Sequence, residues 1–213
     1  MLPEMRKLIF ILLLFISFHS VSQNQPPVSA ELLLGEKRTS MLVTMNRKIS
    51  GDFKYMNITS TTANYDLDKG RAELVMINSA IYQFHKIFGV SAGLQYHFLK
   101  GLVPSVAFHT SYADPVWMFM FIPFLNFRPE TNSENVMIVE YKPQLNDSFK
   151  LYTHIMGLYN HNVTLKSHDR SFYQLRLGVT YRNFTFGAGA NLDYYGAKKI
   201  NENTYGAFLK IDV

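Results

Sequence analysis

Two residues near the middle of the chain, His109 and Ser111, have the types and spacing of a general base beside a nucleophile. Residues two apart on a β-strand project from the same face, so the imidazole and the hydroxyl would lie side by side. Such a pair needs a carboxylate to orient the ring, and Glu140 on a nearby expected strand is the candidate. The three residues allow a hydrolase site, but polar side chains that merely line an interior would have the same pattern.

Three histidines, His97, His109 and His154, fall on the same face of their expected strands. Three imidazoles can hold a metal ion. These three come from separate strands without a local ligand spacing, which favours hydrogen bonding over metal binding. We therefore expect no metal and no other cofactor.

The first 22 residues have the organisation of a secretory signal peptide. Arg6 and Lys7 precede an apolar run over residues 8–18, and the small residues Ser20 and Ser22 follow it. The run is too short to cross about 30 Å of hydrocarbon as a helix. We therefore predict a cleaved signal over residues 1–22.

The composition of the whole chain narrows the classes of protein that it can belong to. Of its 213 residues 47% are apolar, which is too many for a disordered protein. The absence of cysteine excludes disulfide scaffolds and thiolate chemistry. The formal net charge of +5 is spread over isolated basic pairs, which argues against nucleic acid as a partner.

From residue 38 to the end, the chain alternates between apolar and polar residues with a period of two. The segments 88–98, 172–182 and 184–194 show this most clearly, and the hairpin at Arg182-Asn183 joins the last two. The segments reach nine to thirteen residues, close to the ~9–11 that cross a membrane as a tilted strand. This pattern predicts an all-β, antiparallel transmembrane barrel of about 10–12 strands over residues 38–213. Residues 23–37 form either a linker or a first short strand.

Connections at 65–71, 129–134, 161–170 and 196–203 look long, and they alternate with short turns, as the loops of outer-membrane barrels do. His161, His168, Asp169 and Arg170 fall in one of these long segments, where we expect them to be solvated.

The alternation also predicts which side chains face which way. Polar residues expected to line the lumen are Gln95, His97, His109, Lys150, His154, Arg176, Asp193 and Lys210. Aromatic residues expected in the lipid-facing girdles are Phe88, Phe98, Tyr173, Tyr181, Phe184 and Tyr194.

Together, the signal peptide, the alternating segments and the final segment 204–213 resemble small bacterial outer-membrane β-barrel proteins. The resemblance implies an outer-membrane location, with membrane lipid, lipopolysaccharide and the barrel-assembly machinery as partners. Those families typically end in an aromatic residue, whereas this chain ends in Val213. The pattern leaves the oligomeric state open.

Three functions follow from this sequence. The first is a non-catalytic barrel, either structural or a narrow channel for small solutes or ions that leans toward anions. The second is a lipid-modifying hydrolase, because His109-Thr110-Ser111 resembles the His-x-Ser of outer-membrane lipid A deacylases. The third is a soluble secreted barrel that binds a small ligand.

Overall fold

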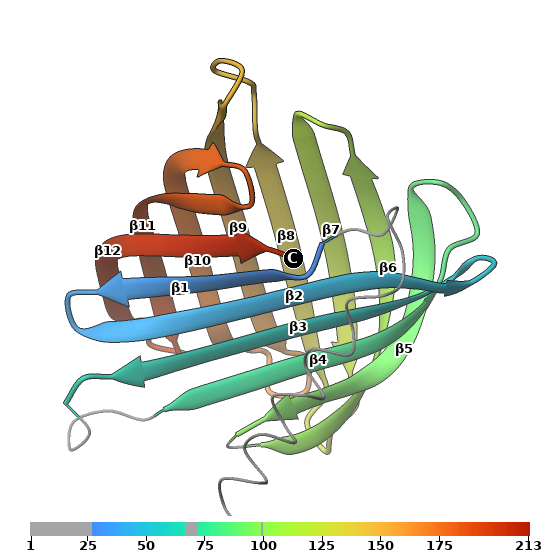
Figure 1. Cartoon of the computed structure of the whole chain (residues 1–213). Coiled ribbons are helices and arrows are strands. Elements are labelled where there is room, and N and C mark those ends of the chain that lie inside the picture. Colours follow the sequence, from blue (N-terminus) through green and yellow to red (C-terminus); the bar gives the residue numbers. More distant parts are fainter. Residues whose placement is uncertain (1–26, 67–71, 99) are drawn as a thin grey trace, which may run out of the picture.

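The computed structural model describes residues 27–66, 72–98 and 100–213, and the expected signal peptide lies outside these residues. Within them the chain forms twelve β-strands (Figure 1). The strands are β1 (Ser29–Gly35), β2 (Arg38–Ser50), β3 (Phe53–Asn64), β4 (Glu73–Tyr82), β5 (Phe88–His97), β6 (Gly101–Ala113), β7 (Trp117–Asn126), β8 (Asn132–Tyr141), β9 (Phe149–Asn162), β10 (Ser167–Tyr181), β11 (Phe184–Tyr195) and β12 (Ile200–Asp212). No helix in the described part of the chain is long and apolar enough to cross a membrane.

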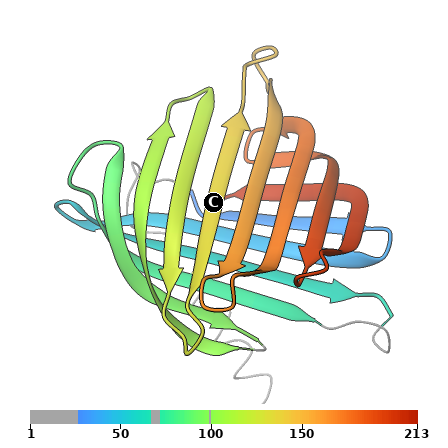
Figure 2. The same ribbon diagram turned by 180° about the vertical axis from the view of Figure 1, so that it is seen from behind.

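Each strand pairs antiparallel with its neighbour in sequence, and β1 pairs with β12 to close the barrel (Figures 1 and 2). The prediction of an antiparallel barrel of 10–12 strands is confirmed. β1 lies within the segment 23–37, so the barrel begins with that short strand and not at residue 38. Because the strand number is even, β1 begins and β12 ends at the same end of the barrel, where Val28 and Val213 exchange two backbone hydrogen bonds. We call this the terminus end and the opposite end the far end.

The expected contrast between long and short connections is wrong. Connections at the far end leave two to eight residues between strands, and those at the terminus end leave two to seven. The largest difference is at residues 161–170, where β9 and β10 continue into the expected loop and only 163–166 connect them.

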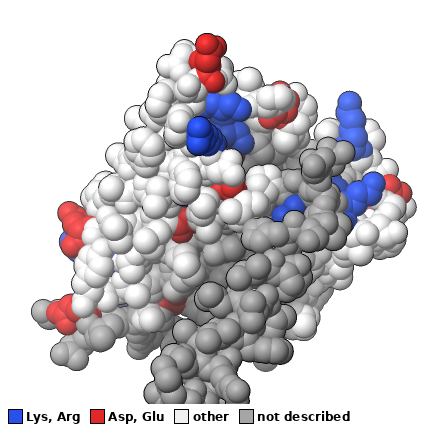
Figure 3. All heavy atoms as spheres, viewed as in Figure 1, with Lys and Arg blue, Asp and Glu red and all other residues white. Residues whose placement is uncertain are grey.

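The outer surface of the wall is apolar, as the alternation predicts. Outward side chains such as Leu177 (60% exposed) and Leu209 (52% exposed) alternate with buried inward ones. Charged side chains are sparse on the wall seen in Figure 3 and gather toward the strand ends. Such a surface suits lipid, because in a soluble protein it would expose a large apolar area to water.

Aromatic side chains form a belt around the terminus end, where neighbouring strands contribute ring pairs. The pairs are Phe53–Tyr82, Phe88–Phe108, Trp117–Tyr141 and Phe149–Tyr181, with centroids 4.3–5.8 Å apart. The girdle residues Phe88, Tyr181 and Phe184 lie at this end, and Phe98 and Tyr194 lie at the far end. Tyr173 projects outward nearer the middle of its strand, opposite Gly157.

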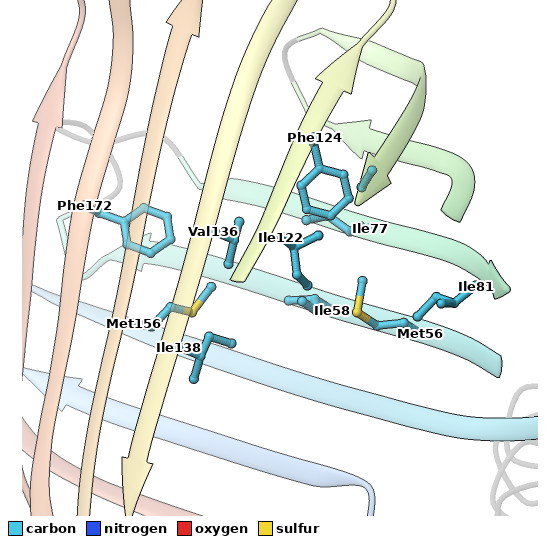
Figure 4. Close-up of a cluster of buried hydrophobic side chains, with 11 residues drawn as sticks. Met56, Ile58, Ile77, Ile81, Ile122, Phe124, Val136, Ile138, Met156 and Phe172 are labelled. Carbon is cyan, nitrogen blue, oxygen red and sulfur yellow. The ribbon is translucent and has the colours of Figure 1, made fainter. Parts of the chain in front are cut away.

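The interior contains a cluster of buried apolar side chains that point toward one another from β3, β4 and β6–β10 (Figure 4). Ile122 and Phe124 belong to it, which explains why residues 116–127 are apolar on both faces. On the opposite wall glycine makes room for large side chains. A Cβ atom at Gly189 would lie 2.9 Å from the Arg176 Cδ and 2.9 Å from the Leu33 Cδ1.

The ladder between β6 and β7 is interrupted beside Pro123. Pairing runs from Ser105 to Ala107 and resumes at Thr110, so Phe108 and His109 lie outside it. The Phe127 N–H donates to the Pro104 carbonyl at 2.8 Å. Hydrogen-bonded pairs recur every two residues along an antiparallel ladder, so Val106–Leu125 and then Phe108–Pro123 should follow the Pro104–Phe127 pair. Proline has no N–H, so Pro123 cannot donate to the Phe108 carbonyl.

This gap predicts that Pro123→Val stabilises the barrel. The valine N–H would complete the ladder in a region where lipid offers no alternative partner, adding about 1 kcal/mol to the free energy of unfolding. Urea unfolding of the barrel in lipid vesicles, followed by tryptophan fluorescence, measures this change. An unchanged or lower unfolding midpoint for Pro123→Val would show that the backbone there cannot accept the bond.

Candidate functional site: a lumen closed by side chains

Ion pairs cross the lumen at the far end. Arg170 Nη1 on β10 lies 3.1 Å from Glu73 Oε2 on β4, and five strands separate β4 from β10 in either direction around the barrel. The Tyr195 hydroxyl reaches the same carboxylate at 3.3 Å. These contacts therefore connect opposite walls directly.

Asp193 joins this crossing to the β1–β2 side of the barrel. Its two carboxylate oxygens accept from Arg170 Nη2 at 2.9 Å and from Arg38 Nη2 at 3.0 Å. Arg38 also pairs with Glu202 Oε2 at 3.3 Å and donates to the Thr204 hydroxyl at 2.8 Å. Two guanidinium groups thus share one buried carboxylate, an arrangement that fixes all three side chains.

Asp169 forms a second crossing beside the first. It pairs with Lys100 Nζ at 2.6 Å from the β5–β6 connection and accepts from Asn132 Nδ2 at 2.9 Å. The expectation that Asp169 and Arg170 are solvated loop residues is therefore wrong. Because β9 and β10 extend beyond the expected loop boundary, both residues reach the far-end network instead.

The middle of the lumen is filled by a buried ion pair on one side and by the apolar cluster on the other. Arg176 Nε donates to Glu31 Oε1 at 2.7 Å, and Arg176 Nη1 donates to Asn191 Oδ1 at 3.0 Å. Asn191 Nδ2 in turn donates to Ser40 Oγ at 3.1 Å. The cluster opposite includes Ile58, which is 5% exposed.

Two cavities lie on either side of this layer. The far-end cavity is about 340 Å³ and is lined by Ser60 and Ile77 as well as by the charged residues of the crossing. The terminus-end cavity is about 720 Å³ and is lined by Met56 and Met120, with lysines toward its mouth. Ile58 lines both cavities, so a single layer of side chains separates them there.

The residues predicted to line the lumen lie on inward-facing positions at different depths. Gln95, His109, His154, Arg176 and Asp193 are buried. His97 is partly buried at the far end, where its Nε2 lies 3.1 Å from Gln95 Oε1. Lys150 and Lys210 lie at the terminus end, where Lys210 pairs with Asp212 at 2.8 Å.

His109, Ser111 and Glu140 each lie on the inner face, but the hydrogen bonds do not join them into a triad. His109 Nε2 bonds the Ser91 hydroxyl at 2.8 Å, a partner that the sequence pattern did not single out. Glu140 is bonded to Lys142 at 2.7 Å, to the Tyr152 hydroxyl at 3.0 Å and to His154 at 3.1 Å. The carboxylate therefore orients His154 and not His109.

The three lumen histidines have different partners. His97 bonds Gln95, His109 bonds Ser91 and His154 bonds Glu140. Within residues 27–66, 72–98 and 100–213, no group of three or more His, Asp or Glu side chains is arranged to hold a metal ion.

Sequence comparisons find no relative of this chain: no protein-family model matches it, and neither does any curated protein. Solved structures do match. The NanC porin aligns with a TM-score of 0.50 and 11% identity, covering 88% of this chain and 100% of that one. The KdgM porin aligns at 0.48 and 8% identity, covering 87% and 98%. LpxR from Salmonella typhimurium aligns at 0.43 and 5% identity, covering 86% and 99%.

The likeness to the NanC porin, along the whole length of that chain, concerns the fold alone. It agrees with the closed twelve-stranded wall and its apolar outer surface. The chain therefore has the fold of a bacterial outer-membrane β-barrel protein, and its apolar outer wall fits that membrane.

Proposed function

We propose that this protein is a non-catalytic barrel that provides a narrow passage for small solutes or ions, closed by side chains in the present conformation. The observation that carries this proposal is the contact of both cavities with Ile58. Within the described residues the separation consists of wall side chains, which can change rotamer without unfolding a strand. Hydrophobic constrictions of this kind gate pores by excluding water.

The charges at the terminus end favour anions as the solutes. Lys54, Lys86, Lys142 and Lys210 line the terminus-end cavity. Lys142 and Lys210 are neutralised by neighbouring carboxylates, whereas no ion pair joins Lys54 or Lys86 to another described residue. A mouth with a surplus of cations raises the local concentration of anions.

The hydrogen bonds of the lumen favour this reading over a hydrolase. No carboxylate is hydrogen-bonded to His109 among the described residues, so the His109–Ser91 pair lacks the group that would orient the imidazole as a general base. The apolar outer wall likewise favours the membrane protein over the soluble ligand-binding barrel. Membrane lipid and lipopolysaccharide would then surround the wall, and the barrel-assembly machinery would insert it.

Conductance across a planar lipid bilayer tests the proposed constriction. We expect the native barrel to be closed most of the time and Ile58→Ser to raise the mean current by about an order of magnitude, since a hydroxyl at that position admits water. Ile155→Ser, an identical change at a residue that is 45% exposed on the outer wall, is the control. A gel of unboiled samples verifies folding. Equal currents for the native barrel and Ile58→Ser would contradict the proposal.

Ion selectivity tests the role of the far-end crossing. In the Ile58→Ser background, Arg170→Gln removes the cation between Glu73 and Asp193 and leaves two carboxylates near the path. We therefore expect the reversal potential in a salt gradient to shift toward cation preference. Lys198→Gln, which removes one charge from an exposed connection, should leave it unchanged. A shift of equal size in both variants would mean that the crossing does not border the ion path.

Lipid analysis tests the absence of catalysis. Ser91→Ala and Ser111→Ala should leave the acyl composition of lipopolysaccharide unchanged, and cells with and without the native protein should also have the same composition. Mass spectrometry of extracted lipid A measures this. Loss of an acyl chain that depends on the native protein and on either serine would establish the hydrolase.

A further inference from the structure

A group of polar side chains faces outward from β3 and β4, whereas most of the wall is apolar. Its members are Tyr55, Asn57, Thr59 and Thr61 on β3 and Asn78 on β4, and we call them the polar patch. Their neighbours Met56, Ile58, Ile77 and Ser79 are buried inside the barrel. Because side chains alternate along a strand, the members of the patch project from the outer face.

The polar patch lies at the middle of the wall. Asn57 and Asn78 are directly opposite each other in the ladder, and both are at least four residues from the ends of their strands. At comparable positions other strands present residues such as Val106 (42% exposed) and Ile155 (45% exposed). The patch would therefore face the hydrocarbon of the bilayer if nothing covered it.

Hydrogen bonds within the patch satisfy only part of its polar groups. Asn78 Oδ1 accepts from the Tyr55 hydroxyl at 2.6 Å and from Asn57 Nδ2 at 2.9 Å, and Asn57 Oδ1 accepts from the Thr59 hydroxyl at 3.1 Å. The Asn78 side-chain NH₂ and the Thr61 hydroxyl have no hydrogen-bond partner among the described residues. A donor without a partner is costly in hydrocarbon, where water cannot replace the missing partner.

We infer that the polar patch is an interface with a second copy of this chain. The patch has no charge, and amides and hydroxyls each supply donors and acceptors, so it is complementary to itself. A two-fold axis places the same surface on both subunits and lets each unused donor meet an acceptor of its partner. Outward methionines Met41 and Met45 of β2, opposite Thr61 and Asn57, provide an adaptable apolar rim.

This interface is separate from the lumen and does not depend on conduction. The double variant Asn57→Leu/Asn78→Leu replaces the two facing amides by apolar groups of similar size. If the patch only served the fold, this change would destabilise the barrel. If it is an interface, the monomer becomes better suited to lipid, and its unfolding midpoint stays the same or rises while association is lost.

Energy transfer between labelled barrels in phosphatidylcholine vesicles tests the inference. Since the chain has no cysteine, Lys198→Cys on an exposed connection takes a single donor or acceptor dye. For the native barrel we expect more energy transfer than random mixing gives, and this transfer should fall when unlabelled native barrel is added. For Asn57→Leu/Asn78→Leu we expect at least a tenfold weaker association. Asn135→Leu, which changes an outward amide of β8 outside the patch, should associate like the native barrel.

Three results would overturn the inference. The first is a native barrel that shows only random transfer at every lipid ratio. The second is association that persists in the double variant. The third is equal loss of association in Asn135→Leu. A gel of unboiled samples for each variant shows whether the barrel has folded, so a folding failure cannot be mistaken for loss of the interface.

Discussion

Pairing of β1 with β12 is the constraint on which the rest of this structure depends. In hydrocarbon an open sheet edge would leave a row of backbone donors and acceptors without partners, so a membrane-spanning sheet must close on itself. A barrel in which every neighbouring pair is antiparallel closes only with an even number of strands, and the short β1 supplies the twelfth. The interruption beside Pro123 shows the same constraint locally, as a place where one ladder bond cannot form.

Closure also determines what the interior can contain. A barrel of twelve strands is wider than the eight-stranded kind that side chains fill completely, and narrower than the porins of 16–18 strands that hold an aqueous channel. Here the middle is filled by large side chains, with glycine opposite Arg176 giving its guanidinium room, and two cavities remain at the ends. The Arg170–Glu73 pair adds a connection between opposite walls at the far end. The proposed passage would be closed by the single layer of side chains at Ile58.

The sequence predicted the fold well because alternation with a period of two is a local property. The strands that contain Gln95, Arg176 and Tyr181 were recognised from residues within a few positions of each. It predicted the ends of strands less well, because polar residues such as Asp169 resemble loop residues until the pairing partner is known. Long-range partners were inaccessible for the same reason: nothing near His109 indicates Ser91, and nothing near Glu140 indicates His154.

The polar patch was missed for a different reason. Asn57 and Asn78 interrupt the apolar face of strands whose alternation is otherwise weak, and only the ladder register shows that they lie opposite each other. The single sequence offers no other signal for such a surface. The interior apolar cluster was equally hidden, since it brings together Met56 on β3 and Ile122 on β7, two strands that are not neighbours in the sheet.

Labelling of single cysteines from one side of the membrane tests most directly whether the lumen is closed at Ile58. The cysteine-free chain allows Met56→Cys and Ser60→Cys to be compared, which lie on the same face of β3 on either side of Ile58 and line different cavities. A charged thiol reagent added at the terminus end should modify Met56→Cys and spare Ser60→Cys, and the same reagent at the far end should do the reverse. Modification of both positions from one end at equal rates would show an open lumen and contradict this account.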